Sequence, residues 1–165
     1  MIEFHKKWIT NSCLIIKENC QKINMLDQEI GDGDHGTTIL RGLEEAVSHF
    51  RANNEFDNSI SFMNEISKLM RISMGGASGI LMTIFFKELG NLNFNDLYNT
   101  ILTTFSNTIN KIETRGKVNF GDKSFLDIYV PIHQELIQNN LIDFDKIITK
   151  IDESLEYTKS LEARV

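Results

Sequence analysis

The chain of 165 residues contains a single proline, Pro131. Proline removes a backbone hydrogen-bond donor and breaks helix interiors, so a sequence nearly free of it is compatible with long, uninterrupted helices. Apolar residues recur at spacings of three and four over most of the chain, which is the period of a helix that buries one face. The sequence therefore predicts an all-α protein.

The apolar periods and the polar or glycine-rich breaks between them define seven expected helices. The first carries a stripe, from Phe4 to Ile23, that is expected to be buried. Pro131 falls inside the sixth, where it is expected to bend the helix. The helices are expected at about residues 3–24, 35–50, 59–74, 78–89, 95–112, 124–138 and 143–165. Short links between amphipathic helices favour an up-and-down bundle within one domain, residues 1–165.

The composition is that of an ordinary soluble domain, with 41% hydrophobic and 24% charged residues. A formal net charge of -6 argues against duplex nucleic acid as a partner, because that requires a basic face. The N-terminus shows no signal-peptide pattern, and no apolar run approaches the ~20 residues that span a bilayer. We therefore expect a cytoplasmic protein without a membrane or nucleic-acid partner.

The cysteines and three of the histidines give no sign of metal binding or redox chemistry. Cys13 and Cys20 lie on one expected helix, where about 10 Å of rise separates them, beyond the ~7 Å reach of a disulfide. Reduced and buried thiols are expected. His5, His49 and His133 lack metal-ligand spacing and are expected at the surface or on a helix face.

The segment from Met25 to Gly36, M-L-D-Q-E-I-G-D-G-D-H-G, places three carboxylates between two helices. Its glycines allow sharp turns and close approach of a ligand. Three carboxylates repel one another unless a cation lies between them, and oxygen ligands without cysteine favour Mg²⁺ or Ca²⁺. Asp27, Asp32 and Asp34 are therefore candidate metal ligands. The alternative is that Asp27 caps a helix and D-G-D forms a solvated turn.

Two further segments have the composition of ligand-binding loops. Gly75–Gly79, G-G-A-S-G, opens a helix whose free N–H groups and positive dipole end favour phosphate. Close helix packing with ordinary capping is the alternative. Arg115–Ser124, R-G-K-V-N-F-G-D-K-S, offers cations and glycines in a long loop, for which a solvated polar loop is the alternative.

These three blocks, in this order, closely resemble those of the L subunit of dihydroxyacetone kinase, the nucleotide-binding component. The matching patterns are L-D-x-E-I-G-D-x-D-H-G followed by R-G-L, then G-G-A-S-G, then R-G-K-x-x-x-G-D-K-S followed by Asp127 and Pro131. The resemblance spans nearly the whole chain. It implies a barrel of antiparallel helices with the nucleotide at one end.

The resemblance implies a phosphotransferase subunit that holds ADP or ATP with two Mg²⁺ ions on the three aspartates. It would pass a phosphoryl group to dihydroxyacetone on a separate K subunit, and a phosphocarrier M subunit of the phosphoenolpyruvate-dependent phosphotransferase system would recharge its ADP. Two alternatives stay open. One is a non-catalytic nucleotide-sensing module that docks on a regulator. The other is the nucleotide domain of a fatty-acid kinase, which usually has threonine where this chain has His35.

The resemblance also implies nucleotide-contacting positions, and it assigns no catalytic side chain. These positions are His35, Gly36, Thr37, Thr38, Ala77, Ser78, Gly116 and Phe125. Phe125 replaces a residue that is often methionine and would form an apolar wall for adenine. Phe120 stands where the family pattern usually has proline, which predicts a looser loop. The chain stops at Val165, before the D-P-G turn and last helix that close over the nucleotide in the family.

Overall fold

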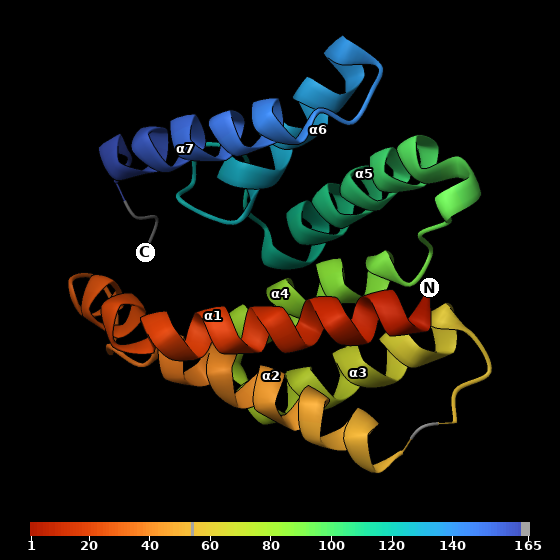
Figure 1. The fold of residues 1–165 in the computed structure, drawn as a ribbon. Coiled ribbons are helices and arrows are strands. Elements are labelled where there is room, and N and C mark those ends of the chain that lie inside the picture. The colour runs from red at the N-terminus through yellow and green to blue at the C-terminus, as the bar shows by residue number, and fades with distance from the viewer. Residues whose placement is uncertain (54, 163–165) are drawn as a thin grey trace. The chain divides into compact units, whose positions relative to one another are not determined.

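The structure is a computed structural model, which describes residues 1–53 and 55–162, with only the backbone at residue 78. This part of the chain contains seven α-helices, one short 3₁₀ helix and no strand (Figure 1), so the prediction of an all-α fold with seven helices is confirmed. None of these helices is long and apolar enough to cross a membrane. The chain divides into two compact units, Met1–Gly90 and Asn91–Val165. That the whole chain forms one domain stays a prediction.

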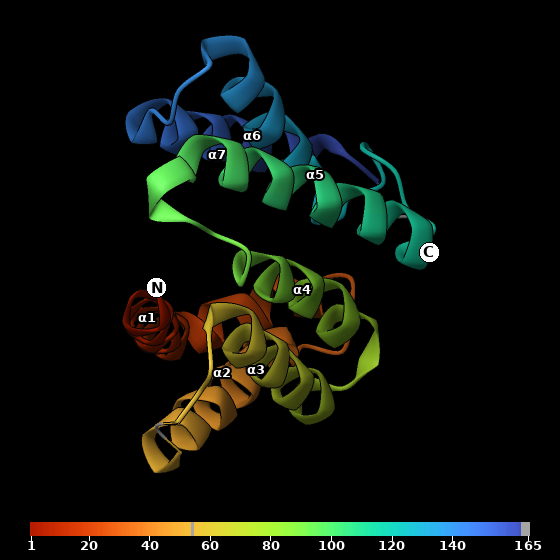
Figure 2. The same ribbon diagram turned by 90° about the vertical axis from the view of Figure 1, so that its right-hand side faces the viewer.

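The first unit consists of four helices in antiparallel order. They are α1 (Ile2–Gln28), α2 (His35–Ala52), α3 (Ser59–Met74) and α4 (Gly76–Leu89). Each helix packs against the next, and α1 also touches α3. Because neighbouring helices run in opposite directions, the α1–α2 loop and the α3–α4 turn lie at the same end of the unit, on the right in Figure 2.

A continuous apolar core fills the first unit. Its buried members come from all four helices and are Ile9, Cys13, Ile39, Leu43, Ala46, Val47, Phe50, Phe62, Met63, Ile66, Met70, Met74 and Phe86. Partly buried aromatic rings complete it, with Phe56 edge-on to Phe62 and Trp8 tilted against Phe86. Burial of this apolar surface is the main force that stabilises the unit. Both cysteines are free, as predicted, although Cys20 is only partly buried.

The expected stripe on α1 is only partly buried. Ile9 lies in the core, but Phe4 is 43% and Ile15 is 59% exposed, so burial of these two side chains was wrongly predicted. His5 lies on the buried helix face and not at the surface. Its imidazole stacks on Phe62, and neither ring nitrogen has a hydrogen-bond partner. Positions 5 and 9 are four apart on one helix, so they share the narrow face that α1 turns toward its neighbours.

Local chemistry explains where α3 and α4 begin. The Asn58 side chain accepts a hydrogen bond from the Ser61 N–H, and the Ser61 hydroxyl accepts one from the Asn58 N–H, so the two residues form a capping box for α3. Gly75, with φ of 68°, ends α3 and precedes α4. Helix α4 begins at Gly76, earlier than the expected Ser78, because glycine in this conformation lets the chain turn directly into a new helix.

The second unit contains the 3₁₀ helix η1 (Phe94–Asp96) and three α-helices. These are α5 (Leu97–Gly116), α6 (Leu126–Asn139) and α7 (Phe144–Ser160). Helix α6 packs against both α5 and α7. Pro131 lies inside α6, as predicted.

Three expectations for the second unit differ from the structure. Helix α5 continues to Gly116, beyond the expected end near residue 112, because Lys117 adopts the left-handed conformation and caps it. The apolar period of the expected fifth helix includes Phe94 just before it and predicts that this side chain points inward, but Phe94 lies in η1 and is 54% exposed. Helix α7 was expected to reach the end of the chain, but it ends at Ser160, and the last three residues lie outside the described part.

Candidate metal and nucleotide site

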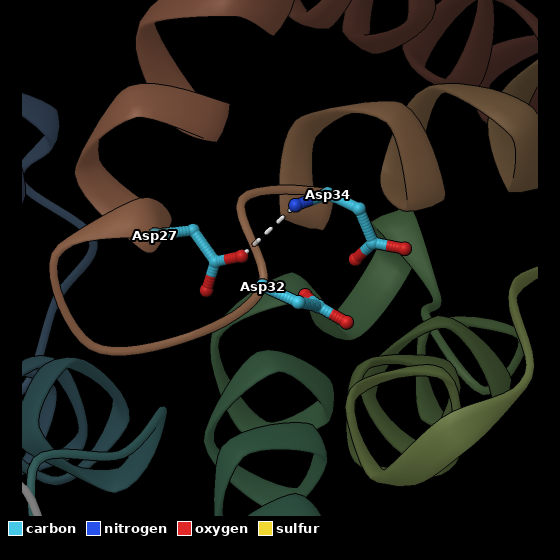
Figure 3. A group of neighbouring side chains, drawn as sticks. All are labelled: Asp27, Asp32 and Asp34. Atoms are coloured by element: carbon cyan, nitrogen blue, oxygen red, sulfur yellow. Dashed lines mark hydrogen bonds between the residues drawn. The ribbon is translucent and has the colours of Figure 1, made fainter.

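One carboxylate organises the loop between α1 and α2. Asp27 lies in the last turn of α1. Its Oδ2 atom accepts hydrogen bonds from three successive backbone N–H groups, those of Gly33, Asp34 and His35, at 2.9, 3.1 and 3.3 Å. Figure 3 draws the bond from Asp34. His35 is the first residue of α2, so Asp27 both closes the loop and caps the following helix, as the capping alternative predicted.

Glycine is required at two positions of this loop. A Cβ atom at Gly31 would lie 2.6 Å from Asp27 Oδ1, so a side chain there would push the carboxylate out of place. Gly33 has φ of +78°, a conformation that residues with a side chain rarely adopt. The two glycines therefore keep the backbone tight around the Asp27 carboxylate.

The tight loop brings the three predicted metal ligands together (Figure 3). Asp27, Asp32 and Asp34 each offer one carboxylate oxygen, and these three atoms lie within 4.8 Å of one another. Asp27 is partly buried, whereas the other two are exposed. Negative charges at this spacing repel one another, so the arrangement gains from a cation bound between them. A donor set made only of carboxylate oxygens fits Mg²⁺ or Ca²⁺.

The first turn of α2 holds four of the expected nucleotide-contacting residues, which differ in exposure. Thr37 is exposed and His35 is partly buried, so a ligand can reach both side chains. Gly36 and Thr38 are buried. A Cβ atom at Gly36 would lie 2.3 Å from the Cys20 carbonyl oxygen, so this glycine lets α1 and α2 approach closely. Helix packing therefore explains Gly36.

Sequence reasoning missed Asn24, which holds Thr37 in place. The Asn24 side chain accepts a hydrogen bond from the Thr37 N–H at 3.1 Å and donates one to the Thr37 hydroxyl at 2.9 Å. Asn24 lies three positions before Asp27 on α1, and such a pair shares one helix face. That spacing was the available signal. The spacing was overlooked because the helix was expected to end at residue 24, whereas α1 continues to Gln28 and contains both residues.

Arg41 of α2 fastens the end of α3, where the α3–α4 turn begins. Its guanidinium group donates to the carbonyl oxygens of Ser73 (Nε, 2.7 Å) and Met74 (Nη2, 3.0 Å), the last two residues of α3. A Cβ atom at Gly42 would lie 2.5 Å from Met74 Cγ, so α2 and α3 are in close contact there. Arg41 and Gly42 begin the R-G-L that follows the carboxylate segment, and this pattern was the signal for their role.

Helix α4 begins at this turn, and its N-cap residue, Gly75, makes no side-chain hydrogen bond to the first N–H groups. Gly75 and Gly76 have φ of 68° and 61°, with open space around both. Ala77 is exposed, and the backbone of residue 78 lies in the first turn of the helix. Free N–H groups at the positive end of a helix dipole favour phosphate. The structure thus brings Ala77 and the backbone of Ser78 to the same end of the unit as the three aspartates.

In the second unit, a buried carboxylate organises the loop between α5 and α6. Asp127 is fully buried, and its two oxygens accept hydrogen bonds from the N–H groups of Gly121 (2.5 Å) and Ser124 (2.7 Å). Gly121 and Lys123 have φ of 95° and 56°, so the loop turns sharply at both residues. Asp127 follows the third sequence block, and this position was the only signal for its role.

The two expected nucleotide-contacting residues of the second unit flank that loop. Gly116 is the last residue of α5, and not a loop residue as expected. Phe125 precedes α6, and its ring stacks on Tyr129 with 6.1 Å between ring centroids. Tyr129 in turn packs edge-on against Phe105 of α5, and burial raises the pKa of its hydroxyl. Phe125 is therefore one end of a row of three aromatic rings, and its contact with adenine stays a prediction.

The fold is all-α, and three carboxylates that could hold a metal ion gather at one end of its first unit. The chain belongs to the DAK2 domain family, which matches residues 29–165. The ADP-binding subunit DhaL of PEP-dependent dihydroxyacetone kinase 1 from Listeria innocua is 30% identical over 163 residues, covering 95% of this chain and 77% of that protein. The ADP-binding subunit DhaL from Escherichia coli is 31% identical over 140 residues, covering 81% of this chain and 64% of that protein.

A solved structure has the same fold. The dihydroxyacetone kinase from C. freundii, crystallised in complex with AMP-PNP and Mg²⁺, matches with a TM-score of 0.76 at 21% sequence identity. The match covers 96% of this chain and 29% of that chain. At this identity the likeness concerns the fold. Together with the family match, it confirms the resemblance that the three sequence blocks indicated.

Proposed function

We propose that this chain is the nucleotide-binding subunit of a dihydroxyacetone kinase, and that it holds ADP or ATP with two Mg²⁺ ions on Asp27, Asp32 and Asp34. The observation that carries the proposal is the convergence of three carboxylate oxygens within 4.8 Å on one loop. The similarity to proteins named ADP-binding subunits of dihydroxyacetone kinases supports it independently.

In this proposal the three aspartates act as metal ligands and not as acids or bases. Bound Mg²⁺ would neutralise charge on the nucleotide phosphates and orient them for transfer. Asp27 directs Oδ2 to three backbone N–H groups, which leaves Oδ1 for a cation. Those hydrogen bonds fix the loop around the carboxylate, and a fixed ligand loses little freedom on binding, which favours affinity.

Other residues of the first unit would bind phosphate oxygens that the metal leaves free. The N–H groups at the start of α4, at Ala77 and Ser78, follow an N-cap glycine that makes no side-chain cap bond, and they suit an anion. His35 and Thr37 offer side-chain donors from the first turn of α2. Asn24 orients Thr37 for this task through its two hydrogen bonds. Gly36 and Thr38 would contribute by packing and through their backbone.

The second unit would contribute to binding of the base. Phe125 offers an apolar ring that Tyr129 holds in place by stacking, and adenine stacks favourably on such a surface. Gly116, without a side chain, would let the nucleotide approach the end of α5. Asp127 would act indirectly, because it fixes the loop between these two positions.

We further assign dihydroxyacetone, held by a separate K subunit, as the phosphoryl acceptor, and a phosphocarrier M subunit as the donor that recharges bound ADP. The support is that the relatives carry the names of PEP-dependent or PTS-dependent kinases and of their ADP-binding subunits. A subunit defined by ADP binding leaves acceptor binding and the supply of phosphate to other chains. The reaction would take place in the cytoplasm.

Calorimetric titration with ADP and Mg²⁺ tests the metal site. Asp32→Asn and Asp34→Asn should each weaken nucleotide binding at least about tenfold, because a carboxamide is a poor Mg²⁺ ligand. Both side chains are exposed, so circular dichroism should stay unchanged. Asp57→Asn, an exposed aspartate between α2 and α3, is the matched control and should bind as the wild type does. Unchanged affinity for Mg-ADP in both Asp32→Asn and Asp34→Asn would refute the proposed metal site.

A transfer assay separates the kinase from a nucleotide sensor. The chain is combined with a dihydroxyacetone-binding subunit and a phosphocarrier subunit, and formation of dihydroxyacetone phosphate is measured. The proposal predicts transfer that stops in Asp34→Asn and persists in Asp57→Asn. Tight Mg-ADP binding without any transfer would instead identify a nucleotide-sensing module.

A further inference from the structure

The loop between α5 and α6 is fastened to the C-terminal end of α7 at two points. The ring of Phe120 stacks on that of Tyr157, with 5.4 Å between ring centroids and 13° between ring planes. The Lys123 ammonium group donates to the Leu161 carbonyl oxygen at 3.0 Å. Leu161 is the C-cap of α7, an end at which the helix dipole favours a cation. We name these two contacts the α7 latch.

The α7 latch and Asp127 hold opposite sides of the same loop. Asp127 is fully buried and binds the N–H groups of Gly121 and Ser124 from within. Phe120 and Tyr157 are 47% and 40% exposed, so their stack lies on the outer side of the loop. The Tyr157 hydroxyl lies beside the loop, 3.7 Å from where a Cβ atom added at Gly121 would be. The loop is therefore restrained from both sides.

The stack on Tyr157 restrains the loop at Phe120. The family pattern usually has proline at this position, and proline fixes the backbone angle φ through its own ring. Phenylalanine leaves that angle free. In this chain the loop is restrained instead by α7, through the stack of Phe120 on Tyr157. This stack offsets the greater freedom that phenylalanine in place of proline gives the loop.

We propose that the Phe120–Tyr157 pair positions the nucleotide site, because it keeps Gly116 and Phe125, which flank the loop, in place against a bound nucleotide. This inference rests on the proposed function. Phe120 and Tyr157 are positioning residues, since they act through the ends of the loop and not on the ligand. If nucleotide leaves when the loop opens, breaking the stack speeds dissociation while the metal requirement of the three aspartates stays unchanged.

The first test uses the full chain without nucleotide. Trypsin cleaves after Lys117 and Lys123 when the loop opens, and the cleavage rate follows the open population. Phe120→Ala and Tyr157→Ala should each raise that rate by about 2- to 12-fold, as the loss of one aromatic pair predicts. Tyr157→Phe keeps the stacked ring and should be cleaved at the wild-type rate.

The second test measures the dissociation rate of Mg-ADP by stopped-flow displacement. The two alanine variants should release ADP faster by the same factor as they are cleaved, and Tyr157→Phe should behave as the wild type does. Phe144→Ala is the matched control, because Phe144 is also an exposed aromatic residue on α7, 68% exposed, and takes no part in the α7 latch. Tyr157→Ala could lower the helix content measured by circular dichroism, because Tyr157 lies in α7. In that case the dissociation rate of Phe120→Ala, a change in the loop alone, is the result that tests the proposal.

The possible failures are distinguishable. Wild-type cleavage and wild-type dissociation in both alanine variants would overturn the α7 latch and leave the proposed function intact, since Mg-ADP would still bind. Equal acceleration in Tyr157→Phe and Tyr157→Ala would also overturn it, because the hydroxyl and not the stack would then hold the loop. Absence of Mg-ADP binding in the wild type would overturn the proposed function and the positioning role together.

Discussion

Replacement of His5 by leucine should make the protein less sensitive to acid. His5 is fully buried in the first unit, and neither of its ring nitrogens has a hydrogen-bond partner. Its neighbours include the rings of Phe4 and Phe62. Burial, and to a lesser degree the positive charge of the N-terminus, lowers the pKa of His5 from 6.5 to about 4. The folded protein therefore keeps the imidazole neutral.

The sign and size of the acid effect follow from this pKa. Above pH 6.5 the imidazole is neutral in the folded and the unfolded chain, so it adds no pH dependence. As the pH falls below 6.5, the unfolded chain binds a proton that the folded protein accepts only near pH 4, and the free energy of unfolding falls. At roughly 1.4 kcal/mol for each pH unit, His5 removes about 3 kcal/mol by pH 4.

His5→Leu removes the titrating group while nearly keeping its size. At neutral pH the variant should be more stable by about 1 kcal/mol, because no unpaired nitrogen is left in the core. Urea unfolding, followed by the fluorescence of the single tryptophan, measures this. Trp8 packs against Phe86 in the same unit as His5, so its signal reports on the relevant core.

The comparison of the two proteins isolates His5, because all other ionisable groups are common to both. The difference in unfolding free energy, in favour of the variant, should widen by about 3 kcal/mol between neutral pH and pH 4. A difference that stays constant over this range would refute the reasoning, since it would mean that His5 has the same pKa in the folded and unfolded chain.

Two further predictions concern glycine packing and the buried carboxylate. Gly36→Ala should lower the free energy of unfolding by about 1 to 3 kcal/mol, because its Cβ atom would lie 2.3 Å from the Cys20 carbonyl oxygen. A glycine-to-alanine change at a helix position with free space would instead raise the free energy of unfolding. The sign of the change measured by urea unfolding therefore tests whether Gly36 is needed for close packing. Asp127→Ala should cost about 2 to 4 kcal/mol and speed hydrogen exchange of the Gly121 and Ser124 amides, which lose their acceptor. Retained slow exchange at these amides would contradict the role of Asp127.

The helices could be predicted from the sequence where their ends are marked by local chemistry. Helix α3 begins and ends as expected, because Asn58 and Gly75 are typical residues for a cap and a break. The end of α5 could not be placed in this way, since Lys117, a residue with a side chain, adopts the left-handed conformation that glycine usually provides. The burial of His5 depends on the helices that cover it, which a local pattern does not contain.

The proximity of Asp27, Asp32 and Asp34 could also be predicted, because they share one short loop in which glycines let the backbone turn. The particular partners of two nearby side chains could not be predicted. Asn24 bonds to Thr37, 13 positions later, and Arg41 bonds to Ser73, 32 positions later. Such contacts form only after the helices have packed, so their partners are not encoded by spacing along one segment.

Helix α1 carries the unpaired imidazole of His5 and the carboxylate of Asp27, a proposed metal ligand, at opposite ends. His5 lies near the first turn and Asp27 in the last turn, and 22 positions at about 1.5 Å each place them about 33 Å apart along the helix axis. Changes at sites so far apart usually add without influencing each other. Acid stability and the proposed metal affinity are therefore expected to vary independently. His5→Leu should stabilise the core and leave any cation binding at the three aspartates unchanged.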